Sequence, residues 1–187
     1  MEDLKKYKEV ERSIVRTRKL LQEDWNDGYP AISTEQIQRL IGKKNKECAV
    51  VIHQAKEGVL TNKTLEKILE EYKYAIVRKY YYTHEMKENN HTFFVVKKED
   101  GSKMIYDSWY LTNKSKYFTK CFDDDIEKYC EFYVNGPQQS DRQGVCAVFA
   151  LATYFSKRLG DLKNLDKRLK EIDSRIRVIK PNKANIR

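Results

Sequence analysis

Residues of four types along the chain could together perform nucleophilic catalysis. They occur in the order His91, Asp107, Gln138-Gln139 and Cys146. A cysteine thiolate is a strong nucleophile, but it needs a basic imidazole nearby, and the imidazole needs an acceptor that orients it. An amide donor near the cysteine can stabilise the negative charge that develops on an attacked carbonyl oxygen. The set therefore predicts acyl transfer, with Cys146 as nucleophile, His91 as base and Asp107 as its orienting acid.

The predicted nucleophile opens an apolar segment. Residues 145–159 (VCAVFALATYFSKRL) are apolar nearly all round in their first half, which is typical of a helix buried in a core. The N-terminus of such a helix presents free N–H groups and a partial positive charge, and both lower the pKa of a thiol. The amide of Gln139, in the preceding loop, could join the backbone N–H of Cys146 as an oxyanion hole.

The predicted base and its acid lie on one β-hairpin. The segments 91–96 (HTFFVV) and 103–110 (KMIYDSWY) flank KKEDGS, which contains an Asp-Gly turn signal. If His91 stands opposite Trp109, Asp107 becomes its diagonal neighbour on the same face, at roughly 7–8 Å between Cα atoms. A register shifted by one residue would place the two side chains on opposite faces.

Each of these residues also has a structural explanation. Cys146 could be a small buried hydrophobe, His91 a polar residue at a strand edge, and Asp107 a turn-capping acid. His84 is a rival base, but it falls in a predicted loop without a paired acid. The order of the four residue types favours the catalytic interpretation over these separate explanations.

The remaining pattern predicts an α+β fold. We expect a central mixed or antiparallel sheet packed on the buried helix, with amphipathic helices at both ends of the chain. Further elements are expected at 35–41 (helix, capped by Ser33 or Thr34), 48–53 (strand), 60–73 (helix, capped by Thr61 or Asn62), 75–83 (strand) and 123–129 (helix). The 187 residues are expected to form one domain, with an N-terminal helix (1–22), a catalytic core (23–158) and a basic C-terminal segment (159–187).

The positive charge is unevenly distributed. The formal net charge is +9, and residues 157–187 hold eleven Lys and Arg against four Asp and Glu. One interpretation is a solvated helical face, because leucines and isoleucines recur there at helical spacing. The other is a surface for DNA or another polyanion, although no nucleic-acid motif accompanies it.

Composition excludes several other classes. The four cysteines form no CxxC pair, and with three histidines they predict neither a disulfide framework nor a zinc site. No cofactor is expected. No apolar run approaches the roughly 20 residues that span a bilayer, and the N-terminus lacks an apolar signal core. We therefore expect an intracellular monomer, in cytoplasm or nucleus, that does not bind membranes.

The motif strings resemble a known protease clan. QQSDRQGVCAVFA (138–150), with HTFFVV and IYDSW upstream, is similar to the cysteine proteases that comprise the deconjugases of SUMO and ubiquitin-like modifiers and the adenovirus-type maturation protease, adenain. The resemblance spans roughly residues 25–158. It implies an α+β fold with His91 as general base, Asp107 as orienter, Gln139 as oxyanion donor and Cys146 as nucleophile.

Particular residues make the sequence resemble the maturation proteases more than the deconjugases. The Trp that helps clamp a Gly-Gly tail in the deconjugases is Thr92 here, and the usual Gly after the cysteine is Ala147. The step from Gln139 to Cys146 equals that of adenain, and WNDGYPAISTEQIQRLI (25–41) looks like adenain's opening segment. The resemblance thus implies a protease of viral structural precursors, packaged in the virion, with DNA as an activator at the basic segment.

Four hypotheses follow for the function. The first is a cysteine endopeptidase that cleaves a protein substrate, a viral structural precursor, at small-residue sites of the Gly type. The alternatives are a protease of ubiquitin-like modifiers, an effector-type acetyltransferase with a similar His-acid-Cys set, and a non-catalytic basic nucleic-acid-binding protein.

Overall fold

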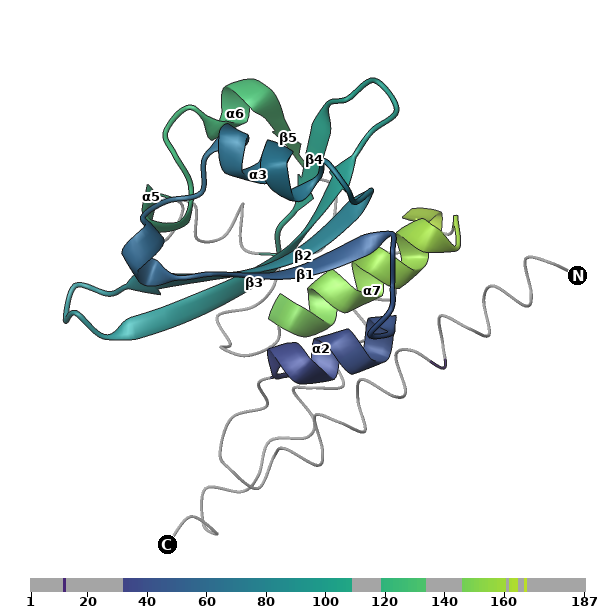
Figure 1. Cartoon of the computed structure of the whole chain (residues 1–187), viewed down its shortest axis with the longest axis horizontal. Coiled ribbons are helices and arrows are strands. Elements are labelled where there is room, and N and C mark those ends of the chain that lie inside the picture. Colours follow the sequence, from purple (N-terminus) through teal and green to yellow (C-terminus); the bar gives the residue numbers. More distant parts are fainter. Residues whose placement is uncertain are drawn as a thin grey trace, which may run out of the picture.

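The computed structural model shows a mixed α/β architecture built on one five-stranded mixed sheet (Figure 1). It describes residues 12, 32–108, 119–133, 146–160, 162–164 and 167. This architecture agrees with the expected α+β class at the level of a mixed sheet with helices. Most of the predicted N-terminal helix, the loop with Gln138 and Gln139, and most of the basic C-terminal segment lie outside the described residues.

The sheet has the strand order β1-β2-β3-β4-β5. The outer pairs, β1 with β2 and β4 with β5, are parallel, whereas β2 with β3 and β3 with β4 are antiparallel. The strands are β1 (Cys48–His53), β2 (Tyr74–Tyr82), β3 (Glu88–Lys97), β4 (Lys103–Tyr106) and β5 (Cys130–Phe132). The short β5 was not expected, because three residues carry no periodic signal and only their pairing with β4 makes them a strand.

The helices are α2 (Thr34–Ile41), α3 (Asn62–Ile68), α5 (Thr119–Cys121), α6 (Ile126–Tyr129) and α7 (Cys146–Arg158), with 3-10 turns η2 (Ala55–Glu57) and η4 (Leu162–Asn164). Side chains of Ser33 and Thr61 cap α2 and α3. The predicted helix 60–73 was too long, because α3 begins only after its cap Thr61 and ends at Ile68, and the residues that follow return the chain to β2. The helix expected at 123–129 begins only at Ile126, because Asp123 accepts a turn hydrogen bond from the Ile126 N–H.

Two apolar layers cover the two faces of the sheet. Along β3, Phe94 and Val96 pack in the cluster that includes α2 and α7, whereas Phe93 and Val95 pack in the cluster that includes α3, α5 and α6. Figure 1 shows the same division, with α2 and α7 below the sheet and the other three helices above it. This alternation follows from the period of two along a strand.

The β3–β4 hairpin has the register that the sequence suggested. Its ladder runs from Lys97 opposite Lys103 to Phe94 opposite Tyr106. Gly101 closes the turn at φ 83, a left-handed conformation that favours glycine. Because β4 ends at Tyr106, Asp107 is the first residue past the strand. The expected partner of His91, Trp109, lies outside the described residues.

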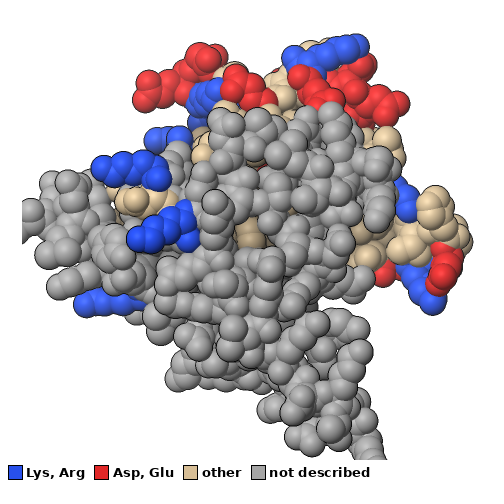
Figure 2. Space-filling model, turned by 180° about the vertical axis from the view of Figure 1, so that it is seen from behind, with Lys and Arg blue, Asp and Glu red and all other residues tan. Residues whose placement is uncertain are grey.

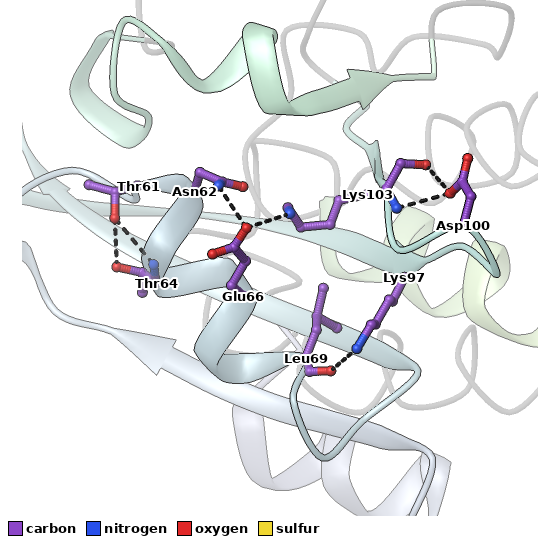
Figure 3. A network of polar contacts seen from close by, with 9 residues as sticks. Thr61, Asn62, Thr64, Glu66, Leu69, Lys97, Asp100 and Lys103 are labelled. Atoms are coloured by element: carbon purple, nitrogen blue, oxygen red, sulfur yellow. Dashed lines mark hydrogen bonds and ion pairs between the residues drawn. The ribbon is translucent and has the colours of Figure 1, made fainter.

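A polar network ties α3 to this hairpin (Figure 3). Glu66 Oε1 accepts from Lys103 Nζ at 3.3 Å and from Asn62 Nδ2 at 2.9 Å. Lys97 Nζ donates to the Leu69 carbonyl at the end of the same helix, at 3.4 Å. Lys103 is buried, so its pairing with Glu66 satisfies a charge that would otherwise be costly to desolvate. The network therefore fixes the start of β4 relative to α3.

Charged side chains mark the end of the molecule that carries α6. Exposed carboxylates there include Asp124, Asp125, Glu127 and Glu131. Figure 2, seen from behind, shows acidic side chains along the upper edge, with lysines and arginines among them and lower down. In the part of the chain that the structure describes, no helix is both long and apolar enough to cross a bilayer.

Candidate active site

His91 and Asp107 form a buried pair at the end of the hairpin. His91 Nε2 lies 2.7 Å from Asp107 Oδ1, and the two residues are only 1% and 3% exposed. The pairing follows from the register, because a continued ladder would place Asp107 opposite Phe93, two residues from His91 on the same face of β3. The Nε2 atom faces the carboxylate, so Nδ1 remains to serve another group.

Cys146 reaches this pair from the opposite face of the sheet. It is the first residue of α7, is 7% exposed, and makes a side-chain hydrogen bond with His91. The β3–β4 ladder stops at Phe94, and beyond it the backbone N–H of Thr92 donates to the Cys146 sulfur. The nucleophile candidate therefore sits at the β3 edge just past the end of β4.

The electrostatics of His91 favour its charged form. Burial lowers the pKa of this imidazole, but the charge of Asp107 and its hydrogen bond outweigh burial, and the contact with Cys146 adds to them. The result is a pKa raised from 6.5 to about 10. At neutral pH the imidazole is therefore an imidazolium held between a carboxylate and a sulfur.

The pKa of the Cys146 thiol is lowered, whereas that of His91 is raised. Burial raises its pKa, but the hydrogen bond and charge of His91, the Thr92 N–H and the charge of Arg78 together bring the pKa below the ordinary 9.0. The start of α7 adds its N–H groups on the same side. A thiolate–imidazolium pair is the state that this arrangement favours.

The other three thiols behave differently. Burial raises the pKa of Cys48 to about 12 and that of Cys130 to about 11, and it also raises the pKa of Cys121. All four cysteines are free and buried, so exposure does not distinguish them. What distinguishes Cys146 is its contact with an imidazolium.

The structure thus brings together three of the four residues that the sequence singled out. Gln139, the expected oxyanion donor, lies outside the described residues. The rival base His84 lies exposed in the turn between β2 and β3. Sequence analysis missed Arg78, a buried side chain of β2 beside Thr92, although a cation inside the apolar strand AIVRKYYY was a visible signal.

This arrangement can perform nucleophilic acyl transfer. A thiolate attacks, an adjacent imidazolium protonates the leaving group, and a carboxylate holds the imidazolium in place. Among the described residues, no group of three or more His, Cys, Asp or Glu side chains could hold a metal ion. No protein-family model matches the chain, and no curated protein matches it either.

Proposed function

We propose that this protein is a cysteine endopeptidase with Cys146 as nucleophile, His91 as acid and base, and Asp107 as the residue that orients His91. The observation that carries the proposal is the buried chain of contacts from Asp107 through His91 to Cys146. It is supported by the contrast among the four thiols, since the pKa falls only at Cys146.

The reaction follows from the charges in the resting pair. The Cys146 thiolate attacks the carbonyl carbon of the scissile peptide bond, and the electron pair of the C=O bond moves to oxygen. The backbone N–H of Cys146 and the Gln139 amide are proposed to stabilise that oxyanion. As the oxyanion collapses, the C–N bond breaks and the leaving amine takes the proton of the His91 imidazolium, which leaves a thioester on Cys146.

Water completes the cycle. The imidazole of His91, now neutral, removes a proton from a water molecule that attacks the thioester carbonyl. The carboxylic acid product leaves, and the sulfur returns to thiolate beside the imidazolium. Asp107 remains ionised throughout and keeps the imidazole in the orientation that both steps need.

The proposed substrate is a protein cleaved at small residues of the Gly type, such as a viral structural precursor. Thr92 supports an endopeptidase over a modifier protease, because its hydroxyl accepts from Arg78 Nε at 3.3 Å where the deconjugases present an aromatic wall. A polar pair at that position offers no stacking surface for a Gly-Gly tail.

Cleavage profiling of a peptide library tests this function. We expect the wild-type protein to cut peptides with Gly or Ala beside the scissile bond, and Cys146→Ala to abolish cleavage. Cys130→Ser is the matched control, because it removes a buried thiol that makes no contact with His91.

The alternatives make different predictions in the same preparation. Hydrolysis of fluorogenic modifier C-termini without peptide cleavage would replace the endopeptidase by a deconjugase. Acetyl transfer from acetyl-CoA would replace it by an acetyltransferase. Salt-sensitive DNA binding, with no turnover of any acyl substrate, would replace it by the non-catalytic hypothesis.

A further inference from the structure

A buried arginine on the α7 side of the sheet lies within electrostatic range of the Cys146 thiol. Arg78 is 9% exposed, and its guanidinium donates to Thr92 Oγ1 at 3.3 Å, to Thr34 Oγ1 at 3.2 Å and to the Ile32 carbonyl. All three acceptors are neutral. Within the described part of the chain, Arg78 forms no ion pair with a carboxylate. The pKa of the exposed Glu35 is lowered first by a backbone hydrogen bond and by Ser33, and the charge of Arg78 adds to these.

Burial of a charge without a counter-ion is costly, and among the residues that the structure describes no carboxylate forms an ion pair with Arg78. The three acceptors satisfy part of the hydrogen-bonding capacity of the guanidinium but none of its charge. Besides the exposed Glu35 carboxylate, an anion in range of the Arg78 charge is the Cys146 thiolate. Its sulfur already accepts the N–H of Thr92, the residue that stands opposite Arg78 in the β2–β3 ladder.

We propose that Arg78 is a positioning residue for the nucleophile: its fixed charge stabilises the Cys146 thiolate, and its hydrogen bond to Thr92 holds the strand whose N–H contacts the sulfur. This inference rests on the proposed function, since it concerns the ionisation of the same thiol. It differs from the role of His91, because a guanidinium keeps its charge at every pH of the reaction whereas an imidazolium does not.

The other titratable groups around the sulfur do not supply a permanent positive charge to the thiolate. His91 supplies a proton that it must release during turnover, and Asp107 is negative and opposes the thiolate. Tyr81 of β2 and Cys121 of α5 also lie in the electrostatic range of Cys146, and burial raises the pKa of both, that of Tyr81 to about 12. Both are therefore neutral at pH 7. Arg78 is the permanent positive charge in this group.

The test is the pH dependence of alkylation of Cys146 by iodoacetamide, followed by peptide mass spectrometry. In Arg78→Gln, which keeps amide donors but loses the charge, we expect the rate at pH 6 to fall about threefold to tenfold and the profile to move to higher pH. Arg78→Lys keeps the charge and, through its ammonium, a donor for the Thr92 hydroxyl, so its profile should stay within about twofold of wild type.

Arg39→Met is the matched control, because it removes an exposed arginine from the last turn of α2. Its profile should equal that of wild type. An unshifted profile in folded Arg78→Gln would overturn the inference. If Arg78→Gln does not fold, Arg78→Lys decides, since a shift in that charged variant contradicts a role for charge. A wild-type protein whose Cys146 shows no enhanced alkylation below pH 8 would instead refute the proposed function.

Discussion

Replacing Asp107 with asparagine should slow alkylation of Cys146 at pH 7 by up to about a hundredfold while the fold is retained. Asparagine has the same shape as aspartate, and its Oδ1 can still accept the Nε2–H of a neutral His91. The variant therefore removes the negative charge but keeps the 2.7 Å contact. The charge matters because it is the main influence that raises the pKa of His91 against burial.

The magnitude follows from the two protonation states. In the intact protein the pKa of His91 is about 10, so at pH 7 the imidazolium outnumbers the neutral ring by about a thousand. Without the carboxylate, burial favours the neutral imidazole, and the thiolate loses its counter-ion. A thiol at the ordinary pKa of 9.0 is only about 1% ionised at pH 7, so the loss of the imidazolium can slow alkylation by up to about a hundredfold, and the Thr92 N–H and the charge of Arg78, which remain, reduce the fall.

The assay is alkylation with limiting iodoacetamide from pH 5 to 10, with each cysteine quantified separately. Cys48, Cys121 and Cys130 serve as internal references in the same sample. Glu131→Gln is the matched variant, because it neutralises an exposed carboxylate that pairs with Lys98 away from the sulfur. If Asp107→Asn keeps its circular dichroism and still alkylates Cys146 at the wild-type rate at pH 7, the ion-pair reasoning is wrong.

Three further outcomes concern stability, each measured by urea unfolding. In Cys146→Ala, His91 still faces Asp107, so the folded state holds a proton that the unfolded chain releases above pH 6.5. The contribution of this proton to the free energy of unfolding should be fully present below pH 6.5. It should decline by at most about 1.4 kcal/mol per pH unit as the pH rises toward the folded-state pKa of His91, which is about 10 in the intact protein. A free energy of unfolding that does not change with pH would contradict this. Met86→Gly should raise stability by up to about 1 kcal/mol, because Met86 has φ 57, and a loss would show that its side chain packs usefully. Phe94→Ala should cost about 3–5 kcal/mol, since the ring is fully buried among aromatic neighbours, and a cost below 1 kcal/mol would refute that packing.

The local sequence pattern was sufficient to predict the strands and the helix that carry the candidate residues. The apolar run at 48–53 is β1, the apolar helix begins one residue from its expected start, and the hairpin register follows from an Asp-Gly turn. These segments have strong periodicity or a turn signal that fixes the pairing. The pair His91–Asp107 could be predicted because both residues belong to one hairpin, where register is a local property.

Non-local features did not follow from local pattern. The contact of Cys146 with His91 was expected from the order of the residue types and from the family resemblance, whereas no local spacing rule gives the geometry that joins α7 to β3. The strand β5 exists through pairing alone, and α6 is shortened by a turn at its start. The network of Arg78 with Thr34 and Thr92 links residues far apart in the chain, so no spacing rule could reveal it.

The turn around Gly101 has a consequence for chemistry that it never touches. Five residues between β3 and β4 determine which residue follows the last ladder pair, and that residue is Asp107, the first after β4. An insertion of one residue in this exposed turn would be tolerated by most loops of a folded protein. Here it would deliver Tyr106 to the imidazole in place of the carboxylate. If the proposed function is right, the length of this remote loop should therefore be held constant, together with the glycine at position 101.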